Sequence, residues 1–247
     1  MISAVVLTSE FNPHLENCLK SLHFCDEIIA IDDNSDSQTL KILKKYHTKI
    51  YPHLLNSDFS DQRNFGLNKA LNPWVLFVDS DEVVSPELSD KIINTIQSND
   101  YTGYYLHRID TIYGKTLLHG DVGDVWILRL ARKEAGAWIN HVHEIWQIDG
   151  LTSKLKGNLD HYPLNSLAQF ITKLNHYSSI RAGELFSSNQ SANLITIILY
   201  PTAKFFHLWL AKLGFLDGSL GLIHALLMSL YSFLVRGKLY LLSIGIN

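Results

Sequence analysis

Hydrophobic and polar positions follow a regular order over the first hundred residues. Four short runs predict strands, at 4–8, 27–31, 49–52 and 74–78. Between and after them, apolar residues recur at helical spacing and predict helices over 12–22, 40–46, 60–71 and 86–97. Apolar strands separated by helices are typical of a mostly parallel sheet with helices on both faces. We therefore predict a Rossmann-like α/β fold.

The pattern changes after residue 100. Aromatic residues are frequent between residues 101 and 148, and this stretch predicts short strands and loops. Ser166 is followed three residues later by Gln169, a capping-box spacing that predicts the start of a helix.

From Leu194 onward the chain is strongly apolar. We predict one helix over 201–213, ended by Gly214, and a second over the 16-residue apolar run 220–235. Such a run is shorter than the ~20 residues that span a bilayer. The two helices predict a hairpin, at about 194–240, that lies in the membrane surface without crossing it. A hairpin buried in the protein core and a true span are the alternatives.

Charge sharpens this division. The 247 residues are 47% hydrophobic and carry a net charge of −3, which allows a sizeable core and argues against a nucleic-acid-binding protein. The excess of positive charge lies in the apolar tail, where we expect four basic residues to meet anionic headgroups: Lys204, Lys212, Arg236 and Lys238. The N-terminus lacks the pattern of a signal peptide, so we expect a cytoplasmic protein on the inner face of the cell membrane.

Asp79, Ser80 and Asp81 directly follow the apolar strand at 74–78. Two carboxylates at this spacing converge on one cation if the backbone turns after the strand. Mg²⁺ or Mn²⁺ prefers oxygen ligands and often keeps substrate phosphates in its coordination shell. The pattern therefore indicates a site for a divalent cation and a diphosphate, with a solvated turn as the alternative.

Two further polar groups follow predicted strands or begin a helix. Asp32 and Asp33 end the strand at 27–31, where a carboxylate can bind a nucleobase or a ribose. The alternative for this pair is a turn formed with the next two residues. Arg63 lies at the start of the helix over 60–71, where it can bind a phosphate or form a surface salt bridge.

A second candidate for chemistry is the segment His141–Val142–His143–Glu144. In a strand, His141 and His143 would lie on one face and Glu144 on the other. These residues can supply a general base or a metal ligand, and structural histidines are the alternative. A zinc site would need further ligands at a spacing that the sequence does not offer.

Taken in order, the pieces AVVLT, IDDNSDS, DQRNFGL and FVDSDE resemble the nucleotide-binding half of family 2 glycosyltransferases, which have the GT-A fold. This resemblance covers roughly residues 1–88. The later pieces RLARK, VHE and GFLDG resemble the bacterial subgroup that includes lipopolysaccharide-core glucosyltransferases. The resemblance implies a GT-A-like catalytic domain over 1–147 and a helical extension over 148–247.

The resemblance also implies roles for single residues. The donor-binding positions are Asp32, Asp33, Arg63, Asn64 and Asp79, and the metal-binding positions are Asp81 and Asp79. Family members invert the anomeric carbon, which requires a carboxylate that deprotonates the acceptor hydroxyl. The E-D pair that carries the base in many relatives is missing in the expected region. We therefore expect Glu144 to be the base, with Asp124 or Asp121 as the alternative.

The expected reaction is transfer of a hexose or heptose from a nucleotide-diphosphate sugar to a glycolipid or cell-envelope glycan, with Mg²⁺ or Mn²⁺ as cofactor. A transferase that uses a polyprenyl phosphate is one alternative, since a phosphate acceptor needs no strong base. A nucleotidyltransferase is disfavoured because no Gly-rich phosphate loop follows the first strand. A nucleotide-sugar-binding module without activity is the alternative of another class.

Overall fold

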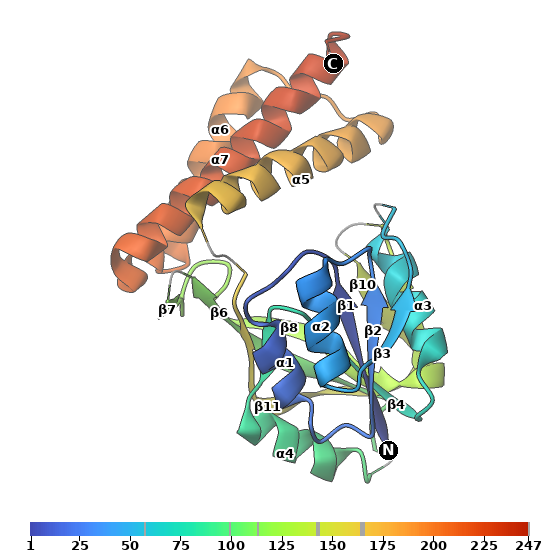
Figure 1. Ribbon diagram of the computed structural model, residues 1–247. Helices are drawn as coiled ribbons and strands as arrows, with labels where there is room; N and C mark the ends of the chain where they lie inside the picture. Colours follow the sequence, from blue (N-terminus) through green and yellow to red (C-terminus); the bar gives the residue numbers. More distant parts are fainter. Residues whose placement is uncertain (57, 99, 113, 142–143, 164–165, 247) are drawn as a thin grey trace. The chain divides into compact units, whose positions relative to one another are not determined.

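Four parallel strands form one half of the main sheet, in the order β3-β2-β1-β4. They are β1 (Ile2–Thr8), β2 (Glu27–Asp32), β3 (Lys49–Pro52) and β4 (Trp74–Asp79). All four lie where the apolar runs predict strands. This computed structural model describes residues 1–247 except 57, 99, 113, 142–143, 164–165 and 247 (Figure 1).

Antiparallel strands complete the sheet. β8 (Val125–Arg132) pairs with β4, and β6 (Gly103–Ile112) pairs with β8. β11 (Thr152–His161) follows and pairs with β5 (Glu82–Val84), while β7 (Lys115–Thr116) pairs with β6. The ten-residue strand β6 thus replaces part of the short strands and loops expected over 101–148, because it is paired in the sheet along both edges.

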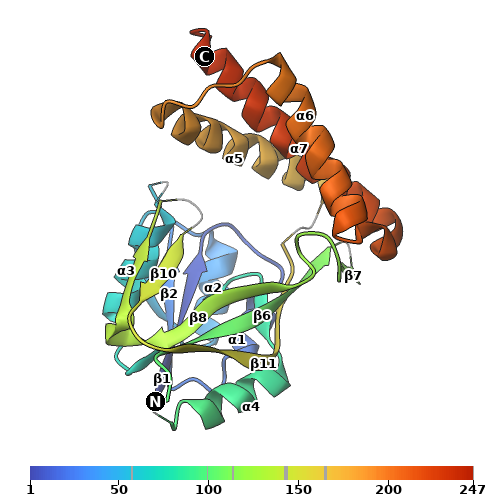
Figure 2. The same cartoon turned by 180° about the vertical axis from the view of Figure 1, so that it is seen from behind.

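Helices cover both faces of the parallel strands, as predicted (Figures 1 and 2). On one face, α1 (Leu15–Ser21), α2 (Ser37–Lys45) and α4 (Pro86–Thr95) share one apolar core with Ala4 and Val6 of β1. On the other, α3 (Phe59–Lys69) and the hairpin of β9 (Gly136–Ile139) and β10 (Ile145–Ile148) pack against Val5. A 3-10 turn, η1 (Lys133–Ala135), precedes β9.

Two local details set the positions of these helices. α1 begins at Leu15 rather than at the predicted Asn12–Pro13, because the Asn12 side chain accepts a bond from the His14 N–H at 2.8 Å and closes a turn instead. In α3, a Cβ at Gly66 would lie 2.6 Å from Val5 Cγ1. Glycine therefore allows α3 to approach the sheet closely, and α3 carries Arg63.

The chain divides into two compact units. The first contains Met1–Ile109 and Val125–Tyr162, and the second contains Asp110–Asp124 and Pro163–Asn247. The division after Tyr162 differs from the boundary expected near residue 147, since β11 comes after that residue and belongs to the sheet.

The second unit is built mainly from helices. They are α5 (Leu167–Ser187), α6 (Leu194–Phe206), the π turn η2 (His207–Ala211), the 3-10 turn η3 (Gly214–Asp217) and α7 (Gly218–Ser243). α7 packs against both α5 and α6 (Figure 1). The Ser166 side chain accepts a bond from the Gln169 N–H, as the predicted cap requires.

The tail helices are longer than predicted. α6 begins at Leu194, where Asn193 and Thr196 form a capping box, and Pro201 lies inside it rather than at its start. α7 has 26 residues, so the prediction that this helix ends at Val235 was wrong. It continues through Lys238, which donates to Ser178 of α5, and Arg236, which lies over the Tyr200 ring of α6. Two segments, Leu194–Ala211 and Gly214–Ser243, are long and apolar enough to cross a bilayer by length and composition alone.

Candidate functional site

The predicted nucleotide and metal residues meet at one edge of the sheet. Thr8 at the end of β1 is in register with Asp32 of β2, and Leu7 is in register with Asp79 of β4. The carboxyl ends of these parallel strands therefore bring Asp33 and Asp79 to the same edge. Ligands bind at this edge in open α/β sheets.

Asp32 and Asp33 differ in their surroundings. Asp32 is buried, and its Oδ1 accepts the Ser35 N–H at 3.3 Å, so its carboxylate helps to hold the turn. Asp33 is half-buried, and its Oδ1 accepts the Leu55 N–H at 2.9 Å. Asn34 turns the chain with a φ of 55°, which asparagine tolerates well. Asp32 thus holds the turn that was one alternative from sequence. Asp33 is compatible with the expected recognition of a nucleobase or ribose.

Arg63 lies at the centre of the site, on the first turns of α3. Asp58 caps this helix by accepting the Asp61 N–H at 3.0 Å. Arg63 is only 2% exposed, so it does not form the surface salt bridge considered from sequence. Its Nε donates to Glu144 Oε1 at 2.9 Å and its Nη2 donates to Asp79 Oδ1 at 2.9 Å. The guanidinium also lies 4.7 Å from the centroid of the Trp138 ring.

A second buried arginine completes this charge cluster. Arg129 of β8 donates from Nη2 to Asp79 Oδ2 at 2.6 Å, so each carboxylate oxygen of Asp79 binds a different guanidinium. The Asp79 N–H donates to Oε2 of Glu82, which is fully buried. Arg129 and Glu82 were not among the residues predicted from sequence. The signals were present, because Arg129 lies in RLARK and Glu82 directly follows the D-S-D triplet.

Burial and charge act in opposite directions on these carboxyl groups. Burial disfavours the Asp79 carboxylate, but Arg129 and Arg63 outweigh it and hold the pKa of Asp79 well below its ordinary value. Burial dominates at Glu82 and raises its pKa, although Arg129 acts in the other direction. Asp79 is therefore an ionised anchor for two arginines, whereas no arginine contact is seen for Asp81 among the described residues.

Asp81 has a different neighbour. His161, at the end of β11, places Nε2 3.7 Å from Asp81 Oδ2. Among the described residues, no three His, Cys, Asp or Glu side chains lie close enough together to hold a metal ion by themselves. Mg²⁺ is commonly held by one or two carboxylates together with substrate phosphates and water. Asp81 and His161 therefore fit a cation whose shell is completed by a bound diphosphate.

Of the His141–Glu144 segment, the described residues His141 and Glu144 lie between β9 and β10 and belong to neither strand. Val142 and His143 lie outside the described residues, so the predicted alternation stays a prediction. His141 Nδ1 lies 2.6 Å from Asp58 Oδ2, at the cap of α3. Glu144 reaches the cluster through Arg63. Within the described part of the segment, His141 has a structural partner and Glu144 lies in the site.

Asn64, the other half of the predicted R-N pair, has its amide bonded to the backbone. Its Nδ2 donates to the Trp138 carbonyl at 2.9 Å, and its Oδ1 accepts the Trp138 N–H at 2.8 Å. These bonds hold β9 against α3. Asn64 therefore positions Trp138, whose ring lies next to both arginines.

The alternative base residues, Asp121 and Asp124, belong to the second unit. Asp121 Oδ1 lies 2.7 Å from His224 Nε2, and its Oδ2 accepts from Lys204 at 3.1 Å. Burial opposes ionisation, but His224 and Lys204 together lower the pKa of Asp121 to about 2. A pKa this low makes the Asp121 carboxylate a weak proton acceptor. Asp217 of GFLDG is likewise buried, and it accepts the His119 N–H at 2.9 Å.

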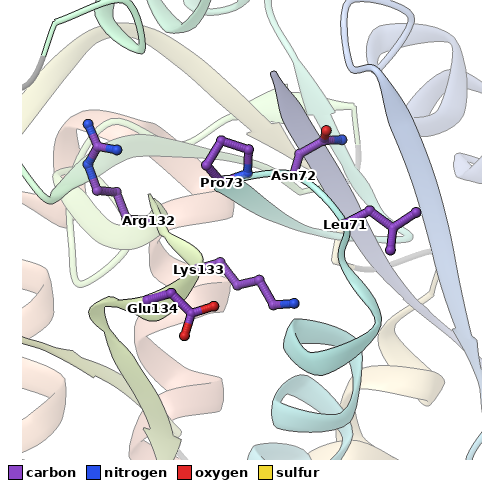
Figure 3. A pocket seen from close by; sticks show the side chains of 6 residues that line it. All are labelled: Leu71, Asn72, Pro73, Arg132, Lys133 and Glu134. Carbon is purple, nitrogen blue, oxygen red and sulfur yellow. The ribbon is translucent and has the colours of Figure 1, made fainter.

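A hollow of about 500 Å³ lies elsewhere on the first unit (Figure 3). It is lined by Leu71, Asn72, Pro73, Arg132, Lys133 and Glu134. These residues directly precede β4, or end or follow β8, whereas Asp79 ends β4. The hollow is therefore at the other edge of the sheet and does not belong to the carboxylate site.

Comparisons with known proteins agree with this geometry. The model of Glycosyl transferase family 2 matches residues 5–144. The chain is 24% identical to the lipopolysaccharide core biosynthesis glycosyltransferase LpsC of Rhizobium meliloti, over 97% of this chain and 92% of LpsC. It is also 24% identical to an uncharacterised glycosyltransferase of Rickettsia typhi, over 98% of this chain and 88% of the relative.

Among solved structures, S. aureus TarS 1-349 in complex with UDP-GlcNAc has a similar fold. The TM-score is 0.51 and the identity 15%, with 100% of this chain and 92% of the TarS chain covered. The fold expected from the sequence, a GT-A-like α/β sheet followed by a helical apolar tail, is confirmed.

Proposed function

Because the chain belongs to glycosyl transferase family 2, we propose that it moves a hexose or heptose from a nucleotide-diphosphate sugar to a glycolipid or cell-envelope glycan of the lipopolysaccharide-core type. The carrying observation is the edge at which Asp33, Asp79 and Asp81 meet beside two buried arginines. LpsC, named for lipopolysaccharide core biosynthesis, supports the choice of acceptor class. The reaction is proposed to proceed with inversion at the cytoplasmic face of the membrane.

On this proposal, Asp33 recognises the nucleotide, because it lies at the end of β2 beside the end of β1. Asp33→Ala should weaken binding of the free nucleotide diphosphate and of the nucleotide sugar alike, each by about tenfold, since a hydrogen bond to a charged group is lost. A thermal-shift panel of nucleotide sugars and free nucleotides, with and without Mn²⁺, measures both affinities. An unchanged affinity for the free nucleotide would place the role of Asp33 elsewhere.

We infer that Asp81 and His161 hold the divalent cation, with Asp79 fixed by arginines beside them. A bound Mg²⁺ or Mn²⁺ supplies positive charge to the departing nucleotide diphosphate. The protein prepares this site through β4 and β11, which bring the two ligands together, and through Arg63 and Arg129, which neutralise Asp79.

Glu144 is our proposed acceptor base. Arg63 binds its Oε1 and so orients the carboxylate at the edge of the site. A base acts in the transition state, so Glu144→Gln should lower turnover by about a hundredfold or more and leave donor affinity nearly unchanged. Steady-state kinetics with a donor-binding measurement separate the two effects.

Two outcomes would reject this assignment. If Glu144→Gln weakens donor binding as much as turnover, Glu144 serves to position Arg63. If Glu144→Gln retains turnover while Asp124→Asn loses it, the base is Asp124.

A dispensable Glu144 together with transfer to a lipid phosphate would favour the polyprenyl-phosphate alternative. Donor binding without transfer to any acceptor would favour the inactive binding module.

A further inference from the structure

The outer face of α6 is apolar and exposed. None of the α6 side chains is buried, and only 6% of the segment Leu194–Ala211 is buried in the structure. The exposed apolar residues of this segment are Leu194, Ile195, Ile198, Leu199, Tyr200, Phe206 and Leu210. A helix that is apolar over so much of its surface is unusual outside a protein core or a lipid environment.

Three polar side chains of this stretch have partners inside the protein. The Thr202 hydroxyl donates to the Ile198 carbonyl at 2.8 Å. Thr196 is occupied by the cap of α6, where its Oγ1 accepts the Asn193 N–H at 2.9 Å. Lys204 donates to Asp121 at 3.1 Å. Internal pairing of this kind lowers the cost of placing a helix against hydrocarbon, where water cannot satisfy polar groups.

α7 continues the apolar surface. Its exposed large residues recur at helical spacing, at Ile223, Leu226, Leu230, Phe233, Tyr240 and Leu241. The opposite side of α7, with Val235 and Leu239, packs against Leu185 of α5. The stripe therefore lies on the side of α7 that α5 leaves uncovered.

The basic residues of the tail are largely engaged within the protein, contrary to the expectation that all four meet headgroups. Lys238 donates to Asn175 Oδ1 at 2.8 Å and to Ser179 Oγ at 2.7 Å, both on α5. The Arg236 guanidinium lies 4.0 Å from the centroid of the Tyr200 ring. Lys204 is bound to Asp121. Of the four basic residues, this leaves Lys212, which is exposed and has no side-chain bond or ring contact in the described part of the chain.

The geometry points to a lipid surface as the partner of these two faces, which we call the α6–α7 face (Ile198, Leu199, Phe206, Leu226, Leu230 and Phe233 at its centre). Attachment is by burial of apolar side chains and not by attraction to anionic headgroups. The choice of lipid over a protein partner rests on the proposed glycolipid acceptor and on the scarcity of free charge on the face.

The attachment lies in the plane of the surface, even though both helices have the length of a span. α5 contacts α7 near both ends, through Phe170 beside His224 and through Asn175 at Lys238. α5 also carries Lys173 and Arg181, which are exposed. A crossing of α7 would draw these charges into hydrocarbon, where charged side chains are costly to bury.

Vesicle flotation of the full-length protein tests this inference. Uncharged phosphatidylcholine vesicles should bind the protein as well as vesicles containing anionic phosphatidylglycerol, within about twofold. Binding should persist in about 1 M NaCl, where the Debye length is about 3 Å. The double variant Ile198→Glu with Leu199→Glu should lower the partition coefficient by about tenfold or more, because two charges replace apolar contacts.

Matched variants exclude trivial effects. Leu151→Glu makes the same kind of change at an exposed leucine of the first unit and should leave binding unchanged. Lys212→Gln removes the remaining basic side chain and should change binding less than twofold. Dependence on anionic lipid, release by salt, or a concentration-dependent dimer that ignores vesicles would each overturn the inference. Because flotation needs no donor, its failure is distinguishable from failure of the proposed transferase activity.

Discussion

Asp81→Asn should lower sugar transfer by about a thousandfold while leaving the protein folded. A divalent cation contributes several kcal/mol of transition-state stabilisation, and about 1.4 kcal/mol corresponds to a factor of ten. Asp81 is the suitable residue for this test because its contact in the structure is the His161 imidazole, with Nε2 at 3.7 Å from Oδ2, and not a buried arginine. Asp79 is unsuitable, since its replacement would also leave two buried arginines without their shared carboxylate.

Three controls make the Asp81 result specific. Asp90→Asn removes an exposed carboxylate on α4 and should leave turnover unchanged. His161→Gln should raise the Mn²⁺ concentration needed for half-maximal turnover, with a smaller loss at saturation. Turnover of the unaltered protein should vanish in excess EDTA and return with Mn²⁺. Full activity of Asp81→Asn, or of the unaltered protein in EDTA, would show that no cation acts at this residue.

Of the variants proposed, Arg129→Met should destabilise the protein most, by about 3 kcal/mol in the free energy of unfolding. Removing one partner of a buried ion pair leaves an uncompensated charge, and such changes cost about 3–5 kcal/mol. Arg63 still binds Asp79, so we expect the lower end of this range. Urea unfolding measures the loss. Arg132→Met, on the same strand but over the Trp74 ring at 4.7 Å, should cost about 1 kcal/mol.

The pH dependence of the Arg129 variant has a definite sign. The two arginines depress the pKa of Asp79, so its ionisation stabilises the fold above about pH 4 and this contribution is lost as the pH falls further. The stability difference between Arg129→Met and the unaltered protein should therefore narrow below about pH 4. Adding Asp79→Asn to Arg129→Met should recover about 1 kcal/mol at neutral pH. A pH-independent difference without recovery would mean that Arg129 acts through packing alone.

The parallel half of the sheet could be predicted from the sequence because its signals are local. β1, β2, β3 and β4 are short apolar runs, and the polar residues that end them mark the carboxyl edge. The positions of Asp33 and Asp79 followed from this pattern alone. Gly66 shows the limit of local reasoning, since its contact with Val5 depends on how α3 packs on the sheet.

The rest of the site depends on contacts between distant parts of the chain. Arg129 reaches Asp79 from β8, and His161 reaches Asp81 from β11. The residues of each pair are far apart in the sequence, and hydrophobic periodicity carries no information about such contacts. The antiparallel order of β8, β6, β11 and β5 decides both contacts. Knowledge of that order would be needed to derive the arginine cluster from sequence.

The tail illustrates a different failure of sequence reasoning. The apolar run that predicted α7 ends at Val235, but Lys238 is bound by α5 and the helix continues to Ser243. Tertiary contacts thus extend the helix beyond its apolar run. The same contacts remove Lys238 from the expected headgroup site, which leaves apolar burial, rather than apolar burial with charge attraction, as the expected mode of membrane attachment.

Transfer of labelled sugar measures the proposed activity directly. Purified protein is incubated with Mn²⁺, bacterial glycolipid and a panel of labelled nucleotide sugars, and label is counted in the extracted glycolipid. One donor should transfer its sugar, with the anomeric configuration inverted, and Asp81→Asn should abolish the transfer. Absence of transfer and of stabilisation by every nucleotide sugar, or transfer that is equal with Asp81→Asn, would contradict the assignment of this carboxylate edge as a metal-dependent glycosyltransferase site.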